Sequence, residues 1–440
     1  MKLDFLILYE HIVRELDSDC LLAAELQRRG FRVELFQLMS RKKIRYFWRK
    51  KPKVIITSAM YDNDTLNSFV YNNVGKLNKI INLHWEEVLS REQEESDFYS
   101  LKQNAAKCIH ICWGEAAKQR IIEHGVKQGN AVVTGAIHLD FLNQRFFGSS
   151  KSKPQLAQEF DIDISKNWIL YISSFSCASM DEGEIGELNE MTNLDFTGFK
   201  QVGARSMTKT LDWFDRLLTD RPENILIYRP HPSEWESKEL SEMKRRHPGM
   251  FKVVSDHTVR EWVLACDDIF TWMSTSISEI FYAEKSCIIL RPEPLYDDYD
   301  PVIYKGCDSV DCYDELLKRF DDKKRKFPIK PELIKAHYSV IEDCPSYMRI
   351  ADLCEEVYCN PPRDIPFSEG YTPHFNLLKF VSLAALNLMV SLRINPDNFR
   401  WLAGKKIVSR TKRLIGYIEK SRVSRKTIKI KIEEFGRLIS

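Results

Sequence analysis

A basic cluster follows a short apolar run near the middle of the sequence. Residues 225–227 are apolar, and Arg229, His231 and Pro232 come shortly after them. An arginine can give two parallel N–H donors to an oxyanion, and an imidazole can give one more. The cluster therefore has the chemistry needed to bind a phosphate. The alternative is that Pro230 and Pro232 only end a strand and leave His231 exposed in a turn.

A hydroxyl cluster follows a second apolar run further along the chain. Residues 269–273 are mostly apolar and end in Ser274, Thr275 and Ser276, after which a helical pattern containing Glu279 begins. The N–H groups and the positive dipole end at the start of a helix favour an anion. Ser276 and Glu279 also match the S-x-x-E capping box, which needs no ligand. Both interpretations stay open from this segment alone.

The two apolar runs have the character of buried parallel strands, because they are short, apolar and sharply bounded. In open α/β sheets, ligands bind outside the carboxyl ends of the strands. We therefore expect the basic cluster and the hydroxyl cluster to converge on one crevice and to bind the same phosphate.

Strand and helix patterns alternate along most of the chain, which predicts a doubly wound parallel sheet in each half. The expected strands of the first half are 3–9, 31–38, 53–58, 79–83, 108–113 and 131–135, with helices at 17–29, 41–51 and 115–124. The expected strands of the second half are 168–173, 225–228, 251–254, 269–273 and 287–290, with helices near 204–219, 234–246, 258–266 and 277–284.

The segment 148–166 is predicted to be a domain linker, because it is mostly polar and contains Gly, Ser and Pro. We therefore expect an N-terminal Rossmann-like acceptor domain at 1–150 and a Rossmann-like nucleotide-donor domain at 160–345, which face a cleft. A helical C-terminal extension is expected at 346–440.

Composition bounds the class of protein. A chain of 440 residues is too long for one ordinary core. Its net charge of +2 favours no acidic partner by itself, but residues 400–440 hold 13 Lys/Arg and 3 Asp/Glu. The eleven cysteines include no C-x-x-C pair, which argues against a zinc or disulfide framework and favours a reducing compartment. Residues 1–17 lack the pattern of a signal peptide.

The apolar segment 375–394 precedes this basic tail and contains Asn376, Lys379 and Asn387. It is marginal for a transmembrane helix, which needs about twenty predominantly apolar residues. It is expected either as a buried helix or as an in-plane helix at a membrane, because basic clusters beside apolar segments bind anionic leaflets. Nucleic acid is not an expected partner, because the tail interleaves Ile, Leu and Val rather than stacking aromatics.

Four stretches together resemble a known group of proteins: YEHIVRELDSDCLLAAELQRRGFRVELF, VTGAIHLDFL, YRPHPSE and MSTSISEIFYAE. Their order is similar to that in bacterial surface-carbohydrate biosynthesis proteins, the GT-B glycosyltransferases of capsule and lipopolysaccharide assembly. It also resembles polysialyltransferases and CDP-glycerol polymerases, which share an HP signature and a later Ser-rich signature. The resemblance covers about residues 3–300.

The resemblance implies roles for the two clusters. His231 and Pro232 fall on the HP signature, which contacts the phosphate of the donor nucleotide. Residues 274–276 fall on the Ser signature, which holds the same phosphate or a donor carboxylate. The letters of residues 181–183 match an acidic signature of polysialyltransferases, but they stand in the other half of the chain, so a solvated loop is the favoured interpretation.

Glycosyl transfer with inversion needs a base for the acceptor hydroxyl and a group that stabilises the departing phosphate. The base is expected from the first half. Asp17 and Glu86 are our choices, although Asp17 can also cap a helix and the expected desolvation of Glu86 beside Trp85 depends on burial. A retaining mechanism with a carboxylate nucleophile stays open.

Other residues of the first half are expected to shape the acceptor pocket. These are Arg14, Glu15 and His84, with Glu15, Glu87 and His11 as further candidates for the base. No Asp-x-Asp metal signature stands at a fitting strand end, and Asp62-Asn63-Asp64 has the character of a turn. We therefore expect no metal and no cofactor, with the nucleotide-sugar donor as a substrate.

The leading hypothesis is a glycosyltransferase that acts at the cytoplasmic face of the membrane. A CMP-linked acidic sugar is the favoured donor and a lipid-linked or polysaccharide molecule the acceptor, with the basic tail on an anionic membrane surface. Three alternatives remain: a CDP-glycerol-type glycerophosphotransferase, a nucleotide-sugar 2-epimerase, and a non-catalytic GT-B scaffold.

Overall fold

The computed structural model describes most of the chain and divides it into two compact units. The described residues are 3–38, 51–84, 86–90, 93, 100–191, 195–234, 237–375, 377–399, 407–409, 411–412, 414–416, 418–419 and 422–440. The first unit comprises Met1–Glu87, Ser100–Asp140 and Ser339–Ser440, and the second comprises Val88–Tyr99 and Phe141–Tyr338. Segment 346–440, which the sequence sets apart as an extension, thus belongs to the first unit. The helix expected at 41–51 lies almost wholly outside the described residues.

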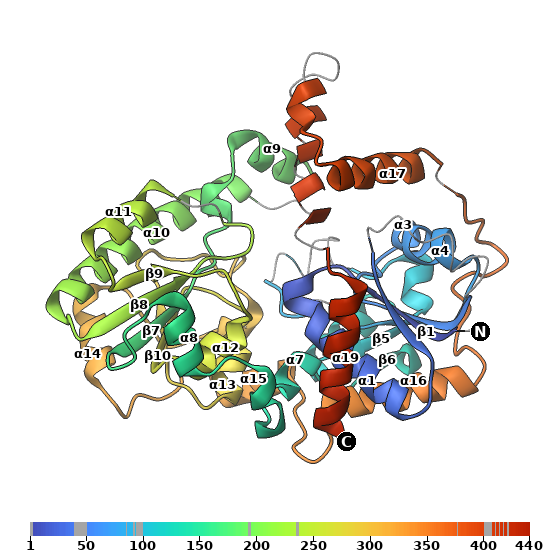
Figure 1. Ribbon diagram of the computed structural model, residues 1–440, viewed down its shortest axis with the longest axis horizontal. Coiled ribbons are helices and arrows are strands. Elements are labelled where there is room, and N and C mark those ends of the chain that lie inside the picture. Colours follow the sequence, from blue (N-terminus) through green and yellow to red (C-terminus); the bar gives the residue numbers. More distant parts are fainter. Residues whose placement is uncertain are drawn as a thin grey trace. The chain divides into compact units, whose positions relative to one another are not determined.

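The first unit contains a six-stranded sheet in which every neighbouring pair is parallel (Figure 1). The strands, in the order β2-β1-β3-β4-β5-β6, are β1 (Leu3–Tyr9), β2 (Val33–Gln37), β3 (Pro52–Thr57), β4 (Ile80–Asn82), β5 (Ile109–Cys112) and β6 (Ala131–Val133). All six match strands predicted from the sequence. Every residue of β1 is buried, as is typical of a parallel strand with both faces covered.

Helices of the first unit come from both ends of the chain. They are η1 (Ile12–Leu16), α1 (Asp17–Arg28), α3 (Asn63–Thr65), η2 (Leu66–Tyr71), α4 (Asn72–Val74), η3 (Gln103–Lys107), α6 (Glu115–Glu123), η4 (Gln128–Asn130), α7 (Ile137–Asp140), α16 (Ser346–Cys359), α17 (Leu377–Leu392), η8 (Pro396–Phe399) and α19 (Arg425–Ile439). Helix α1 packs against α16 and α19, and Gly30, at φ 89°, follows its end as predicted.

Two landmarks of the first unit fix its C-terminal segment. Gly135 approaches the backbone so closely that an added Cβ would lie 2.3 Å from the carbonyl oxygen of Ser339, and its φ is +79°. The Asp140 carboxylate accepts the N–H groups of Ser346 and Tyr347 at 2.9 and 2.8 Å and so caps α16. The stretch VTGAIHLDFL therefore has a structural role in this unit.

The second unit contains another six-stranded parallel sheet, with the order β12-β11-β10-β7-β8-β9. The strands are β7 (Asn167–Ile172), β8 (Asn224–Arg229), β9 (Phe251–Val253), β10 (Asp268–Thr271), β11 (Cys287–Leu290) and β12 (Ser309–Val310). The sequence predicted the first five. It missed β12, because two residues are too few to show a strand period.

Helices of the second unit mostly match the predicted ones. They are η5 (Gln144–Ser149), α8 (Lys153–Phe160), η6 (Cys177–Ser179), α9 (Glu182–Met191), α10 (Phe196–Asp220), α11 (Lys238–Arg246), α12 (Val259–Ala265), α13 (Ile277–Tyr282), η7 (Val302–Tyr304), α14 (Tyr313–Asp321) and α15 (Pro331–His337). Two expectations were wrong. The predicted linker contains α8, begun by a capping box of Ser152 and Gln155. The segment 181–183, expected as a solvated loop, leads into α9, which begins at Glu182.

Each sheet has one topological switch point, where successive crossovers run in opposite directions. In the first sheet it lies between β1 and β3, and in the second between β7 and β10. In doubly wound sheets the ligand crevice opens at the carboxyl ends of the strands at this point. The residues that follow β1, β3, β7 and β10 are therefore the first places to look for function.

Candidate functional site

Three loops meet around the carboxyl end of β7 in the second unit. Ile172, the last residue of β7, lies opposite Arg229 of β8 on one side and Thr271 of β10 on the other. Because neighbouring strands lie about 4.8 Å apart, the loop of His231 and the loop of Ser274 flank the loop that begins at Ser173. The two clusters predicted from the sequence thus stand at the same edge of one sheet.

The HP segment forms a tight turn. The His231 carbonyl accepts the Glu234 N–H at 2.8 Å, which places Pro232 at the second position of a β-turn, where proline is favoured. The Ser233 N–H donates to His231 Nδ1 at 3.2 Å, so the proton of the neutral ring lies on Nε2. His231 is half-buried and Pro232 is exposed. The imidazole thus carries an N–H donor at the edge where ligands bind.

Glu234 anchors this turn, and the sequence analysis missed it. Its Oε1 accepts the Tyr228 hydroxyl at 2.6 Å, and its Oε2 accepts the Ser173 hydroxyl at 2.6 Å and the His231 N–H at 3.3 Å. Burial raises the pKa of Glu234 above its usual value. The glutamate is the last letter of YRPHPSE, but its partner Ser173 is distant in sequence and gives no local signal.

Arg229 lies where the sequence puts it, at the end of β8, but it is buried. Its NH1 donates to the Asp256 carbonyl at 2.9 Å and its NH2 to the His257 carbonyl at 2.6 Å. Burial lowers the pKa of Arg229 to about 10. The two nitrogens of a bidentate phosphate contact are therefore engaged with backbone, and the expected role of Arg229 at a phosphate stays a prediction.

The hydroxyl cluster forms a loop held by Tyr304. The Tyr304 hydroxyl accepts the Ser274 N–H at 2.8 Å and donates to the Ser274 carbonyl at 2.7 Å. The Ser276 N–H donates to Ser274 Oγ at 3.3 Å. Ser274, Thr275 and Ser276 are all half-buried. Tyr304 lies 30 residues further on, and nothing in the sequence marked it as a partner.

The capping box weighed from the sequence does not form. The side chain of Ser276 makes no cap hydrogen bond, and Glu279 Oε2 accepts the Ser278 hydroxyl at 3.1 Å instead. Helix α13 has six residues, so its dipole contributes little. The hydroxyl groups of the loop, rather than the helix end, are the features that can serve an anion.

The switch point itself is closed by apolar side chains. Phe175, after β7, and Trp272, after β10, are both buried, and their ring centroids lie 4.8 Å apart. The Ser174 hydroxyl, next to Phe175, donates a hydrogen bond to the Met273 carbonyl. The loops that follow β7 and β10 are therefore joined by one apolar contact and one polar contact.

Glu15 occupies the switch point of the first sheet. Its Oε2 accepts the Glu10 N–H at 2.9 Å and the Ser58 hydroxyl at 2.6 Å, and its Oε1 accepts the His11 N–H at 3.1 Å. Ser58 directly follows β3, so one carboxylate joins the ends of both strands. Burial raises the pKa of Glu15 to about 7, although all three hydrogen bonds oppose this.

Asp17 is the first residue of α1 and forms an ion pair with the C-terminal helix. Its Oδ1 lies 2.5 Å from Lys431 Nζ of α19. One carboxylate oxygen of Asp17 is thus engaged by an ammonium group. Arg14 is exposed on η1, a π-helical turn, and His11 precedes that turn; burial lowers the pKa of His11. The assignment of Asp17 as the base stays a prediction.

The desolvated carboxyl group of the segment INLHWEEV is Glu87 rather than Glu86. Glu87 is buried and accepts the Trp113 N–H at 2.6 Å, and burial raises its pKa to about 8. Glu86 is half-buried, and its Oε1 accepts the Glu87 N–H at 3.0 Å. Trp85, the expected cause of a raised pKa at Glu86, lies outside the described residues.

His84 belongs to a buried polar cluster at the ends of β4 and β5. His84 Nε2 lies 3.2 Å from His110 Nδ1, and His110 Nε2 donates to the Ala105 carbonyl at 3.0 Å. Asn82 Oδ1 accepts the Met60 N–H, and Asn82 Nδ2 donates to the Met60 carbonyl, both at 3.2 Å. Burial lowers the pKa of His110 to about 4 and that of His84 well below its usual value. His84 also has a φ of 56°, an uncommon conformation for histidine.

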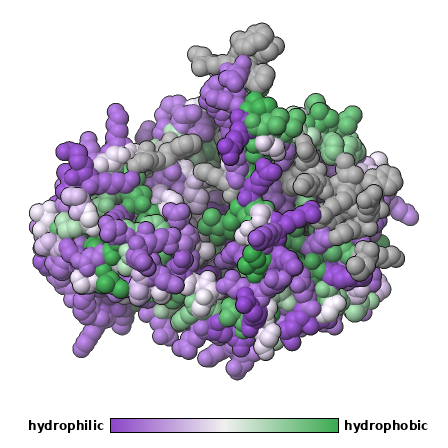
Figure 2. Space-filling view, viewed as in Figure 1, coloured by the Kyte–Doolittle hydropathy of each residue, from purple (hydrophilic) through white to green (hydrophobic). Residues whose placement is uncertain are grey.

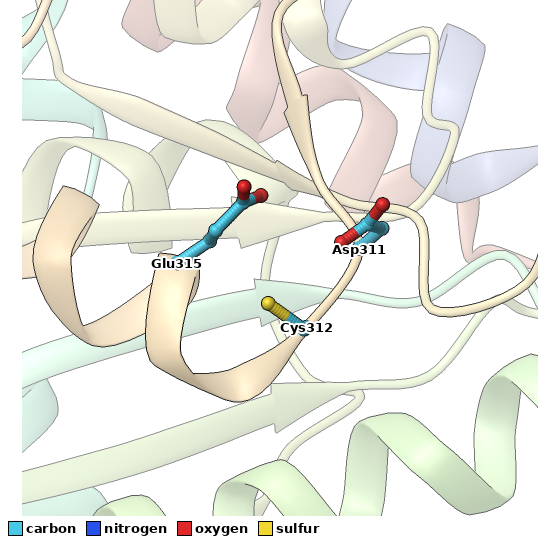
Figure 3. Close-up of side chains that lie close together, drawn as sticks. All are labelled: Asp311, Cys312 and Glu315. Atoms are coloured by element: carbon cyan, nitrogen blue, oxygen red, sulfur yellow. The ribbon is translucent and has the colours of Figure 1, made fainter.

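Among the described residues, one group has the spacing of a metal site: Asp311, Cys312 and Glu315 (Figure 3). All three side chains are exposed at the start of α14, as acidic groups often are without a metal. Asp62, part of the Asp-Asn-Asp stretch, caps α3 through a capping box with Thr65, which agrees with the predicted turn.

Helix α17 carries an exposed apolar face. Val390 packs with Ile415 and Ile418, whereas Leu378 and Leu392 are 78% and 61% exposed. Figure 2 shows apolar side chains gathered at the surface over this helix. None of the described helices has both the length and the apolar character needed to cross a membrane. The buried-helix interpretation therefore fits only one side of α17.

Comparison with solved structures finds the same fold at low sequence identity. A variant of the wall teichoic acid polymerase TagF soaked with CDPG matches with a TM-score of 0.54 and 11% identity, covering 81% of this chain and 88% of that chain. The UDP-GlcNAc 2-epimerase of Methanocaldococcus jannaschii matches with a TM-score of 0.50 and 13% identity, covering 81% of this chain and all of that chain. No protein-family model and no curated protein matches the sequence. The predicted fold class, two Rossmann-like domains of the GT-B type, is confirmed.

Proposed function

We propose that this chain is a glycosyltransferase that transfers a sugar from a nucleotide-activated donor to a surface polysaccharide acceptor. A CMP-linked acidic sugar is the favoured donor, because the HP and Ser-rich stretches resemble those of transferases that use one. The observation that carries the proposal is the meeting of the His231 loop and the Ser274 loop at the carboxyl end of β7.

The chemistry of these loops supports binding of a departing phosphate. His231 presents an Nε2–H donor, and residues 274–276 add hydroxyl groups on the other side of β7. Such donors stabilise the charge that develops on the leaving oxygen. Because these groups can donate hydrogen bonds to the leaving oxygen and the oxygens of Glu234 already accept hydrogen bonds, we propose a reaction without a metal ion, and added chelator is expected to leave the rate unchanged.

We propose Glu15 as the base for the acceptor hydroxyl, in place of Asp17 or Glu86. Its pKa of about 7 suits a general base near neutral pH. Oε1 accepts one hydrogen bond, so it keeps acceptor capacity for a hydroxyl proton. The ion pair of Asp17 with Lys431 and the half-buried position of Glu86 give those residues less support.

We also propose that the protein binds the inner face of the cell membrane peripherally. The exposed residues Leu377, Leu378 and Val381 of α17 offer an apolar face, and residues 400–440 carry a large excess of Lys and Arg. An apolar face beside a basic segment is the pattern of an in-plane helix on an anionic leaflet. At the membrane surface the protein would encounter a lipid-linked acceptor.

Two neighbours of the fold define the competing reactions. The similarity in fold to TagF, which was soaked with CDPG, makes a CDP-glycerol-type glycerophosphotransferase the second candidate. The similarity to the Methanocaldococcus jannaschii enzyme makes a UDP-GlcNAc 2-epimerase the third. The transferase moves an anomeric carbon, the glycerophosphotransferase moves phosphorus, and the epimerase changes a sugar without an acceptor.

Mass spectrometry of nucleotide bound to the purified chain, followed by a thermal-shift panel of CMP, CDP, UDP and GDP, tests the proposal. Stabilisation by CMP, and loss of donor hydrolysis in His231→Ala with the fold intact, are expected for the favoured donor. Conversion of UDP-GlcNAc without an acceptor would instead identify an epimerase. Binding of no nucleotide would leave a non-catalytic scaffold.

A further inference from the structure

We infer that Glu234 is the positioning residue of the donor site, and that it acts by holding His231 against the ends of β7 and β8. The identity of the ligand rests on the proposed function. The role of the carboxylate rests on the geometry of the turn, which stands without it.

The carboxylate links three segments of the second unit. It accepts hydrogen bonds from the hydroxyl groups of Ser173, which follows β7, and Tyr228, which lies within β8, both at 2.6 Å. Those two residues are buried, so the acceptor end of Glu234 is fixed by the core of the sheet. The His231 N–H completes the set at 3.3 Å.

The turn passes this constraint to the imidazole. The Glu234 N–H closes the turn on the His231 carbonyl at 2.8 Å, and Pro232 restricts the backbone between them. Within the same turn the Ser233 N–H reaches His231 Nδ1 and thereby sets which ring nitrogen holds the proton. Without the carboxylate, the turn loses its connection to β7, and the direction of Nε2–H is no longer fixed.

The contacts of Glu234 require an acceptor oxygen in the position of Oε2 more than they require a negative charge. Glutamine can keep an oxygen there, because the Tyr228 hydroxyl, which would lose its acceptor Oε1, can donate to the Ser173 hydroxyl oxygen 2.9 Å away. Alanine offers no acceptor oxygen. The role as a positioning residue thus predicts a large effect of Glu234→Ala and a small effect of Glu234→Gln.

The first arm of the test needs no nucleotide. The imidazole Cε1–H signal of His231 is assigned in NMR spectra of the full chain by its absence in His231→Ala. Glu234→Ala is expected to shift or broaden this signal, and Glu234→Gln and Asp163→Ala are expected to leave it unchanged. Asp163 is the matched control, since it accepts the Ser165 N–H and hydroxyl at 2.9 and 2.7 Å before β7 begins.

An unchanged His231 signal in Glu234→Ala would overturn the inference. If that variant does not fold, Ser173→Ala decides, because it removes one donor to Glu234 and leaves the carboxylate in place. A His231 signal that does not respond to Ser173→Ala would then overturn the inference.

The second arm is a double-mutant cycle in nucleotide affinity, measured by calorimetry with CMP, CDP, UDP and GDP. Glu234→Ala is expected to weaken binding about tenfold in the wild type and by less than about twofold in His231→Ala, because the two residues act as one unit. Additive losses would contradict the inference. If the wild type binds none of the four, the proposed function fails, and the NMR arm still decides the role of Glu234.

Discussion

The Ser174 hydroxyl donates a hydrogen bond to the Met273 carbonyl, and this bond crosses the switch point of the second sheet. It ties the loop after β7 to the loop after β10 just before the hydroxyl cluster begins. The loop after β7 is therefore joined directly to the loop that carries Ser274, and a change in one is expected to move the other.

Ser174→Ala is expected to weaken nucleotide binding about fivefold while costing about 1 kcal/mol of stability, the usual contribution of one hydrogen bond. Calorimetry and denaturant unfolding measure the two effects separately. Ser165→Ala is the control, because it removes a hydroxyl bonded to Asp163 at the far end of β7. Equal binding losses in both variants would mean that the link across the switch point has no special role.

Replacing Glu15 is expected to affect catalysis more than replacing Asp17. The pKa of Glu15, about 7, predicts that donor turnover rises with pH through neutrality as this group ionises. Glu15→Gln should lower turnover about a hundredfold and abolish its rise with pH, whereas Asp17→Asn should leave the turnover and its pH dependence nearly unchanged. If turnover of Glu15→Gln still rises with pH as in the wild type, the base is another residue.

The raised pKa of Glu15 also has a consequence for stability. The folded chain binds the Glu15 proton more tightly than the unfolded chain does, since the pKa rises from 4.5 to about 7. This contribution is complete below about pH 4.5 and is lost as the pH rises through 7. Glu15→Gln should therefore gain stability relative to the wild type as the pH is raised over that interval.

The buried histidine cluster predicts the opposite dependence on pH. The pKa of His110 falls from 6.5 to about 4 on folding, so its contribution to stability is present above pH 6.5 and is lost as the pH falls toward 4. The free energy of unfolding changes by about 1.4 kcal/mol when the folded and unfolded pKa values differ by one. His110→Gln should flatten the acid side of the stability curve, measured by urea unfolding between pH 4 and 7.5. An identical slope in wild type and variant would contradict the burial of a neutral His110.

Local pattern was enough to predict the positions of the strands and the edge at which the two clusters stand. Strands such as 3–9 and 287–290 are short apolar runs between breakers, and their carboxyl ends must share one edge of a parallel sheet. The partners of the cluster residues were not predictable. The contacts of Arg229 with two carbonyls, of Ser274 with Tyr304 and of Asp17 with Lys431 depend on tertiary packing over long separations.

The choice between Glu86 and Glu87 shows the same limit at a single step of the chain. Adjacent residues in an irregular segment give no period from which burial can be read, and the structure buries Glu87. The strand-end argument did not single out Ser173 or Glu234, because the sequence placed Ser173 inside the expected strand 168–173 and Glu234 inside the expected helix 234–246.

The exposed face of α17 predicts binding to anionic vesicles. Leu378→Asp combined with Val381→Asp should reduce binding to vesicles that contain phosphatidylglycerol about tenfold or more, since apolar contact is replaced by charge. Ile365→Asp is the control, because Ile365 is 49% exposed outside this helix. Vesicle flotation at low and high salt separates the apolar part from the electrostatic part. Equal binding of the α17 variant and the wild type would contradict membrane contact through α17.

The central claim is that the His231 loop and the loop of residues 274–276 bind the same phosphate. Calorimetric titration of the nucleotide found with the purified chain, into wild type, His231→Ala, Ser276→Ala and the double variant, tests it most directly. Each single change is predicted to weaken binding about tenfold, and the double variant is predicted to lose less than the sum of the two free energies. Binding that is unaffected by either change, or affected by only one of them, would contradict a shared phosphate site.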